Sequence, residues 1–342
     1  MTLPTGAVLQ NRYRIVKPVG QGGFGAVYRA WDLSLEQPVA VKENFDSGPE
    51  SQRQFEREAK LLAGLRHPNL PRVGDHFSVP GQGQYLVMDY VEGKSLAVLL
   101  AERGGPLSEA EAVPWVRQVC DALTYLHTRT PPIIHRDVKP ENIIVTTEGR
   151  AMLVDFGISK IYDPSKGTTL GAKAVTPGYS PLEQYGRGRT DARSDVYALG
   201  ATLYTLLTGQ APPEAPDLSS GADVLVPPRD ANPAVSEATS RAVLAAMALS
   251  KSQRLGDAAS FEQLLPTRVA PVAPPPVAPT QLATPPPVAS TQSAASLAPT
   301  QTRGSSPTNK EVWGCLALLA LLVLVGLVAL YFWFDFIGLF AG

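Results

Sequence analysis

The octapeptide HRDVKPEN, from His135 to Asn142, carries more charged and amide side chains than an ordinary surface turn requires. Asp137, Lys139 and Asn142 follow one another at offsets of two and three residues. This spacing suits a catalytic loop, but solvent-facing polar residues could adopt it as well. The neighbouring segments distinguish between these two interpretations.

A short hairpin follows the octapeptide and leads to a further acidic residue. The apolar segments IIV and AMLV, separated by a Glu-Gly pair, predict two strands and a turn that end at Asp155 of the tripeptide DFG. Asp155 and Asn142 can supply the few protein oxygens that Mg²⁺ takes when substrate phosphates complete its coordination. Asp137 is then available to accept a hydroxyl proton, and Lys139 to meet the charge of a transferring phosphate.

Further towards the N-terminus, GQGGFGAV places Gly20, Gly22 and Gly25 between two strand patterns. Glycine in such a turn lets backbone N–H groups approach phosphate oxygens closely. Dinucleotide-binding folds use the same spacing, but there a helix follows, whereas Val27 and Tyr28 here continue a strand. Taken alone, the motif suits a plain glycine hairpin equally well.

The tetrapeptide VAVK adds a lysine to the next strand. Because side chains alternate along a strand, Ala40 and Lys42 face one side and Val39 and Val41 the other, which directs Lys42 towards the glycine-rich turn. A charge in such a cleft needs a partner. Glu58, on the helix predicted after this strand, is the candidate.

These four motifs occur in the order of the protein kinase signature. The chain therefore resembles a bacterial, eukaryotic-like (Hanks-type) serine/threonine protein kinase over roughly residues 12–265. The resemblance implies an α+β, bilobal fold with a small antiparallel β lobe that contains one helix and a larger, mainly helical lobe. The expected bounds are 12–88 for the small lobe, 89–93 for the hinge and 94–265 for the larger lobe.

The resemblance also assigns site residues. The implied catalytic residues are Asp137 as the base, Lys139, Lys42 and its partner Glu58, and the implied ligands of Mg²⁺, or alternatively Mn²⁺, are Asn142 and Asp155. The implied ATP-binding residues, besides Lys42, Asn142 and Asp155, are Gly20, Gln21, Gly22, Gly23, Phe24, Gly25, Val27, Ala40, Met88, Asp89 and Val91. Met88 resembles the gatekeeper, and residues 89–91 resemble the hinge that meets adenine through its backbone.

The segment TPGYSPLEQ resembles the end of an activation segment, with Pro-Leu-Glu where the family usually has Ala-Pro-Glu. The resemblance implies an ion pair between Glu183 and Arg254, and a bracing role for Asp195 behind the catalytic loop.

Lys139 is typical of the serine/threonine branch. Thr168 and Thr169 are the expected sites of activating phosphorylation, for which a homodimer would act in trans.

Composition limits the other classes of function. The charges nearly cancel, with 30 Lys+Arg against 31 Asp+Glu, so no overall basic surface predicts a nucleic-acid partner. The two cysteines, Cys120 and Cys315, offer neither a disulfide framework nor zinc-ligand spacing, and both are expected to be buried thiols. Glu102 and Glu109 are expected on solvated helix faces. The N-terminus has no signal-peptide pattern.

The C-terminal part has a different character. Residues 266–311 are rich in Pro, Ala, Thr and Ser and predict a disordered linker. Residues 312–334 carry no charge and are long enough, at about 1.5 Å per residue, to cross a hydrocarbon core of about 30 Å. Arg303 and Lys310 precede this segment, which predicts a single-pass cell-membrane protein with a cytoplasmic kinase domain and a short extracytoplasmic tail, 335–342.

Two other classes of function must be compared with a protein kinase that acts on Ser/Thr hydroxyls. A pseudokinase would bind nucleotide or act as a scaffold, but every expected catalytic position is filled. A small-molecule phosphotransferase of related fold would not need the long segment from Asp155 to Glu183, which suits peptide substrates. The sequence does not specify the substrate or the activating signal.

Overall fold

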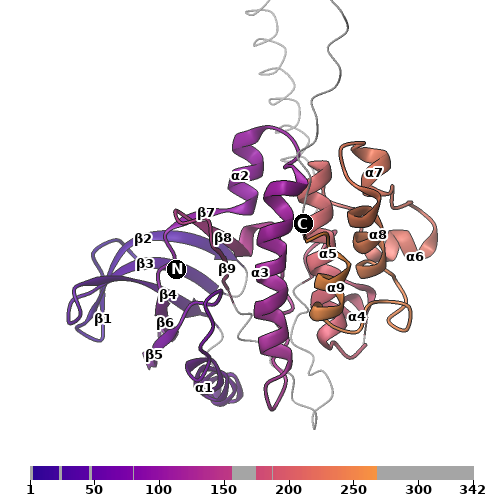
Figure 1. Ribbon diagram of the computed structural model, residues 1–342. Helices are drawn as coiled ribbons and strands as arrows, with labels where there is room; N and C mark the ends of the chain where they lie inside the picture. Colours follow the sequence, from indigo (N-terminus) through magenta and orange to yellow (C-terminus); the bar gives the residue numbers. More distant parts are fainter. Residues whose placement is uncertain are drawn as a thin grey trace, which may run out of the picture. The chain divides into compact units, whose positions relative to one another are not determined.

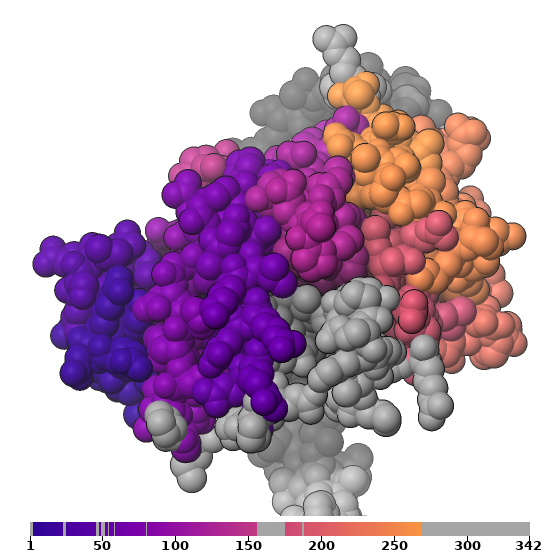
Figure 2. All heavy atoms as spheres, turned by 90° about the horizontal axis from the view of Figure 1, so that it is seen from below, coloured from indigo at the N-terminus to yellow at the C-terminus, as the bar shows by residue number. Residues whose placement is uncertain are grey.

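The computed structural model describes residues 3–22, 25–45, 48–79, 81–155, 175–186 and 188–267, without the side chains of residues 49–51, 54 and 58. All of these residues belong to one compact unit, Met1–Pro275. Figure 1 shows a strand-rich lobe beside a helical lobe. Figure 2, turned by 90°, shows the same division, with the indigo and violet small lobe on one side and the pink to orange helices on the other.

The small lobe contains an antiparallel sheet with the strand order β1-β2-β3-β4-β6-β5. Its strands are β1 (Val8–Leu9), β2 (Tyr13–Gly22), β3 (Gly25–Asp32), β4 (Gln37–Asn44), β5 (Val73–Val79) and β6 (Gly83–Asp89). The predicted strands of the YRIV, GAVY and VAVK segments are confirmed as β2, β3 and β4. β1 was not predicted, and it precedes the expected domain start at residue 12.

Helix α1 (Pro49–Ala63) connects β4 to β5 and packs against β5. The apolar stripe of this segment, which runs from Phe55 to Leu65, predicts a helix that continues until His67 and Pro68 stop it, but α1 ends at Ala63. The N–H groups of Gly64 and Leu65 bond to carbonyls three residues earlier, which tightens the last turn. Leu65 nevertheless remains buried, as its place on the apolar stripe predicted.

The larger lobe is mainly helical. Its helices are α2 (Leu96–Arg103), α3 (Glu109–His127), α4 (Leu182–Tyr185), α5 (Ala192–Thr208), α6 (Ala215–Ser220), α7 (Pro228–Ala231), α8 (Glu237–Ala246) and α9 (Ala258–Leu264), with the 3-10 turn η1 (Pro140–Asn142). A small sheet, β7-β8-β9, consists of β7 (Gly93–Ser95), β8 (Ile143–Thr146) and β9 (Ala151–Leu153). Helix α3 packs against α5 and α9 (Figure 1). Apolar residues at helical spacing predict helices in the segments 109–127 and 194–209, and the structure confirms them as α3 and α5.

Two groups of buried apolar residues stabilise the fold. The larger one joins α1 and the cleft side of the sheet to the helical lobe, through residues such as Phe55, Leu86 and Leu123. The smaller one lies on the other face of the sheet and includes Tyr28 and Tyr85. Burial on both faces explains why the central strands of this lobe are so rich in apolar residues.

Glu109 is a correction to the sequence analysis. It is only 7% exposed, and it accepts hydrogen bonds from the backbone N–H (3.1 Å) and hydroxyl (2.7 Å) of Ser236, which caps α8. Its position on α3 looked solvent-facing because the segment that covers it lies far away in the sequence. Cys120 is buried, as predicted, and burial raises the pKa of its thiol.

The predictions for the C-terminal part fall mostly outside the described residues. The linker, apart from its first two residues, the apolar segment 312–334 and Cys315 are not among them. Within the part of the chain that the structure describes, no helix combines the length and the apolar character needed to cross a membrane.

Candidate active site

The cleft face of the small lobe is set by the alternation of β4. Val39 and Val41 are buried in the smaller apolar group, so Ala40 and Lys42 point to the opposite face. Ala40 pairs with Met88, and Lys42 lies between Val27 on β3 and Leu86 on β6. The structure therefore brings together, on one face, Val27, Ala40, Lys42 and Met88, which the sequence assigned to one nucleotide site.

The glycine-rich turn connects β2 to β3, where Gly20 pairs with Val27 and Gly22 with Gly25. Gly23 and Phe24 lie outside the described residues. A Cβ at Gly25 would lie 2.0 Å from the carbonyl oxygen of Glu43, so only glycine allows β3 to pair with β4 here. At Gly20 and Gly22 a Cβ would meet open space, so packing within the sheet does not require glycine at these two positions.

Lys42 forms an ion pair with Asp155, although the two residues are far apart in the sequence. Both side chains keep some exposure, 18% and 35% respectively, so the pair lies at the edge of the cleft rather than in a sealed core. Asp155 has a φ of 62°, in the left-handed region that a non-glycine residue rarely adopts. Glu58 lies on α1, but its side chain is not described, so its predicted pairing with Lys42 stays a prediction.

The octapeptide forms a tight cluster around Asp137. The amide nitrogen of Asn142 donates to Oδ2 of Asp137 at 2.9 Å, and Lys139 Nζ lies 3.2 Å from the same oxygen. The Thr176 hydroxyl donates to Oδ1 at 2.9 Å. These contacts fix the direction of the Asp137 carboxylate, and Asp137 itself stays partly exposed, as a group that exchanges a proton with a substrate must be.

A buried aspartate holds the backbone of this loop. Asp195 on α5 accepts from the N–H groups of His135 (2.8 Å) and Arg136 (2.7 Å), and its Oδ2 lies 2.8 Å from His127 Nε2. Burial alone would raise the pKa of Asp195, but the hydrogen bonds and the nearby histidines lower it overall. Arg136 has a φ of 63°, so this brace stabilises a strained backbone. The predicted bracing role of Asp195 is confirmed.

The predicted ion pair between Glu183 and Arg254 is also confirmed. Arg254 Nη1 lies 2.7 Å from Glu183 Oε1, and the Ser194 hydroxyl donates to the same oxygen at 2.8 Å. Both charged side chains are almost fully buried. Their hydrogen bonds attach α4 to α5 and to the loop after α8, in spite of the Pro-Leu-Glu sequence.

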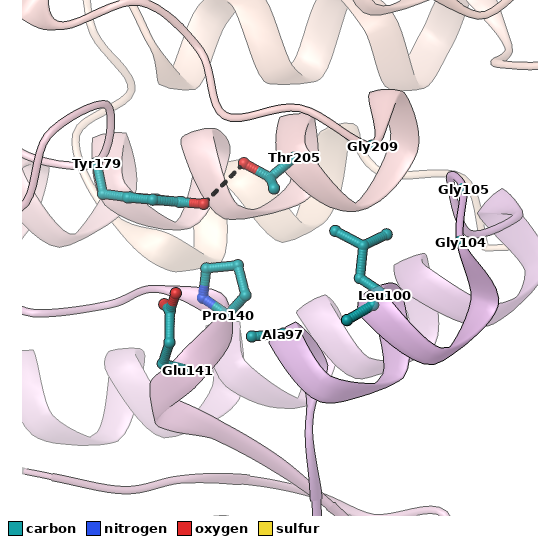
Figure 3. A pocket seen from close by; sticks show the side chains of 10 residues that line it. Ala97, Leu100, Gly104, Gly105, Pro140, Glu141, Tyr179, Thr205 and Gly209 are labelled. Carbon is teal, nitrogen blue, oxygen red and sulfur yellow. Dashed lines mark hydrogen bonds between the residues drawn. The ribbon is translucent and has the colours of Figure 1, made fainter. Parts of the chain in front are cut away.

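A pocket of about 350 Å³ lies beside the catalytic loop. Small residues of α2 and of the turn after it form one wall, and Pro140 and Glu141 of η1 form another (Figure 3). At its back, the Tyr179 hydroxyl and the Thr205 hydroxyl are 3.1 Å apart and hydrogen-bonded (Figure 3). Of the octapeptide, only Pro140 and Glu141 line this pocket.

The donor atoms in the cleft fit a hard divalent cation that shares its coordination with phosphates. Asn142 directs its amide nitrogen to Asp137, which leaves the amide oxygen as the atom able to bind a metal ion. Asp155, which follows β9, supplies carboxylate oxygens. Within the described residues, no three His, Cys, Asp or Glu side chains form a cluster that could hold a metal ion. One carboxylate and one amide are the set that Mg²⁺ uses beside nucleotide phosphates.

Residues 89–93, which the sequence assigned to the hinge, run from the end of β6 to the start of β7. Asp89 ends β6, and its N–H donates to the Arg72 carbonyl at 2.9 Å, while Val91 lies in the connection to β7. The sequence analysis missed three residues that organise the site: His127, which binds Asp195, Gln184, which donates to the Arg136 carbonyl at 3.0 Å, and Leu86, which lies opposite Lys42. Each acts through a tertiary contact, and no local sequence pattern identifies it.

Comparison with known proteins gives an independent view of this geometry. The family described as protein kinase domain matches residues 13–228. The serine/threonine-protein kinases pkn2 and Pkn1 of Myxococcus xanthus are 36% identical over 225 residues and 35% identical over 283 residues. These alignments cover 63% and 78% of this chain, but only 26% and 40% of the relatives, so the chain spans well under half of their length.

Solved structures show the same fold. PpkA-294 in its apo form has a TM-score of 0.62 at 28% identity and covers 78% of this chain and 99% of its own. The PknI kinase domain of Mycobacterium tuberculosis has a TM-score of 0.61 at 27% identity, with 77% and 98% covered. The family match extends over more than half of the chain and includes the cleft described above. The chain therefore belongs to the protein kinase family, among relatives named as serine/threonine-protein kinases.

Proposed function

We propose that this chain is a serine/threonine protein kinase that transfers the γ-phosphoryl group of ATP to protein hydroxyls. The observation that carries the proposal is the pair of contacts around Asp155. Lys42 of the small lobe pairs with Asp155, and Asn142, which donates to Asp137, accepts a hydrogen bond from the N–H of Val154 beside Asp155. In phosphoryl transfer, most of the rate comes from positioning and charge stabilisation, and this arrangement provides both.

The residues that bind ATP come from both lobes. Lys42 binds the α- and β-phosphates, with Glu58 as its predicted partner, and the glycine-rich turn from Gly20 to Gly25 covers the phosphates with backbone N–H groups. Met88 and the backbone of residues 89–91 contact adenine. Asn142 and Asp155 would hold Mg²⁺, which would neutralise charge on the phosphates.

The residues of the octapeptide act on the acceptor. Asp137 orients the Ser or Thr hydroxyl and accepts its proton, and the hydrogen bonds from Asn142 and Thr176 keep the carboxylate in one orientation. Lys139 places a positive charge beside the transferring group.

Regulation and location are further parts of the proposal. Phosphorylation of Thr168 or Thr169 by a second copy of the chain would order the activation segment through Arg136. The uncharged segment 312–334 would anchor the chain in the cell membrane with the kinase domain in the cytoplasm. Carbonate-resistant retention in a membrane fraction, lost on deletion of residues 312–334, tests the anchor, and phosphopeptide mapping tests the two threonines.

Phosphate transfer to a generic protein, measured with ATP and Mg²⁺, tests the function. Asp137→Asn should lower kcat about 100-fold or more, because it removes the general base without changing the size of the side chain. The matched control is Asp121→Asn, an exposed acid on α3, which should keep full activity. Equal activity of wild type and Asp137→Asn, or phosphate found on tyrosine alone, would contradict the proposal.

A further inference from the structure

A buried acidic residue lies directly behind Lys42. Glu43 is its neighbour on β4 and points to the opposite face of the sheet, where it is 3% exposed. Among the described residues, no ion pair joins Glu43 to a lysine or an arginine. A carboxylate in such surroundings is costly unless hydrogen bonds replace the water that it has lost.

Two tyrosine hydroxyls supply these hydrogen bonds. Tyr28 on β3 donates to Oε2 of Glu43 at 2.7 Å, and Tyr85 on β6 donates to Oε1 at 2.8 Å. Burial, together with the hydrogen bond to Glu43, raises the pKa of Tyr28 to about 12, so this hydroxyl keeps its proton at neutral pH. Because β3 and β6 are the two neighbours of β4, Glu43 ties all three strands together.

The N-terminal segment contributes to the same network. The N–H of Leu3 donates to the Tyr28 oxygen at 3.0 Å, which directs the Tyr28 proton towards Glu43. Gly6 and Ala7 exchange backbone hydrogen bonds of 2.8 Å with Ile15 and hold the segment against the sheet. These residues precede position 13, where the family match begins, so the network extends beyond the matched region.

Glu43 also contacts the residues on the cleft side of the sheet. The Glu43 carbonyl oxygen is the atom that a Cβ at Gly25 would strike, so Glu43 lies under the end of the glycine-rich turn. Lys42 is its immediate neighbour. A strand that slips by one residue reverses every side chain, and a buried hydrogen-bonded carboxylate opposes such a slip.

We propose that Glu43, held by Tyr28 and Tyr85, is a positioning residue that fixes Lys42 and the end of the glycine-rich turn against the nucleotide phosphates. The inference rests on the proposed function, because Lys42 is assigned there to the phosphates of ATP.

The test compares nucleotide affinity in two sets of tyrosine variants. The double variant Tyr28→Phe, Tyr85→Phe removes both donors and keeps both rings. It should raise the Kd for ATP, and the KM for ATP, about 5- to 10-fold, with kcat changed less than about 2-fold, since each lost hydrogen bond has a modest net effect. If the double variant does not fold, the two single variants support the same comparison.

The matched control is Tyr13→Phe. Tyr13 is 1% exposed in the same apolar group, but its hydroxyl donates to Asp75 at 2.7 Å and not to β4. This variant should lower the unfolding temperature and leave the Kd for ATP unchanged. Glu43→Gln can still bond to both hydroxyls, so its Kd for ATP should stay within about 2-fold of wild type. Glu43→Leu cannot bond to them, and its Kd for ATP should rise as in the double variant.

A direct measurement of ATP binding distinguishes a failure of this inference from a failure of the proposed function. A wild-type chain that binds ATP but transfers no phosphate contradicts the proposed function alone. An unchanged Kd in the double variant, or an equal rise in Tyr13→Phe, contradicts the inference alone. A wild-type chain that does not bind ATP contradicts both.

Discussion

The cleft and the base of the helical lobe each contain an ion pair, and the two pairs differ in exposure. Lys42 and Asp155 are 18% and 35% exposed, whereas Arg254 and Glu183 are 0% and 6% exposed. The buried pair has the Ser194 hydroxyl and several backbone carbonyls as additional partners. The cleft pair can exchange its partner for a ligand, and the buried pair cannot do so without leaving a charge uncompensated.

This difference indicates how the molecule separates stability from chemistry. Charges that must meet substrate stay at the surface of the cleft, where an ion pair contributes little to folding. The buried charges of Arg254 and Glu183 are instead held by several further hydrogen bonds. We therefore expect substitutions in the two regions to affect different measurements.

Arg254→Met should have the largest effect. It leaves the Glu183 carboxylate buried without its cation, which costs about 3–5 kcal/mol of unfolding free energy. Urea denaturation followed by circular dichroism measures this loss. A loss below about 1 kcal/mol would show that water reaches Glu183 and would remove the contrast between the two pairs.

Lys42→Met should give the opposite pattern. We expect kcat/KM to fall about 100-fold or more, because a cation directed at the phosphates is lost. The free energy of unfolding should change by less than about 1 kcal/mol, because the cleft pair is partly exposed. The same urea experiment, with Arg254→Met beside it, checks this expectation. A large loss of stability would show that the cleft pair is structural.

We expect a lower pH to reduce the free energy of unfolding through the buried groups His135 and Asp195. Burial lowers the pKa of His135, and the pKa of Asp195 is also lowered, so both groups bind protons more readily in the unfolded chain. Stability should therefore fall as the pH falls below about 6.5 for His135 and below about 3.9 for Asp195, by at most about 1.4 kcal/mol per pH unit for each proton.

Urea midpoints between about pH 7.5 and pH 5 measure the His135 part of this slope. His135→Gln, which can still bond to the Val154 carbonyl, is the matched control and should show a shallower slope. A midpoint that stays constant or rises towards pH 5 would contradict the assigned direction.

The smallest contrast compares two glutamates of the helical lobe. Glu109→Ala should cost about 1–2 kcal/mol, because it leaves the Ser236 N–H and hydroxyl without their buried acceptor. Glu102→Ala should cost about 0.5 kcal/mol or less, since Glu102 is 52% exposed in its pair with Lys94. If both variants lose the same free energy of unfolding in urea denaturation, the burial of the glutamate does not determine the loss.

Much of the fold could be predicted from local patterns. Short runs of β-branched and aromatic residues predicted β2, β3 and β4, and an apolar stripe predicted α3. These elements carry strong periodicity and clear breakers, which act over a few residues. The burial of Glu109 depends on Ser236, which lies far away in the sequence, so local patterns could not predict it.

The candidate site shows the same division. Motif order identified Lys42, Asp137, Asn142 and Asp155, because each occupies a fixed place in a short segment. The braces are different: His127, Gln184 and Glu43 act by contacting residues from other parts of the chain. Their sequence surroundings resemble those of ordinary helix or strand residues.

The amino-acid sequence by itself determined the kinase-type order of motifs, the alternation that turns Lys42 to the cleft, and the residue types able to bind a metal ion and accept a proton. Only the tertiary structure decided that Lys42 pairs with Asp155, that Asp195 supports the loop from behind, and that Glu43 lies buried between two tyrosines. The physical reason is range: strand alternation and turn chemistry act between neighbouring residues, whereas burial and ion pairing depend on which distant segments meet.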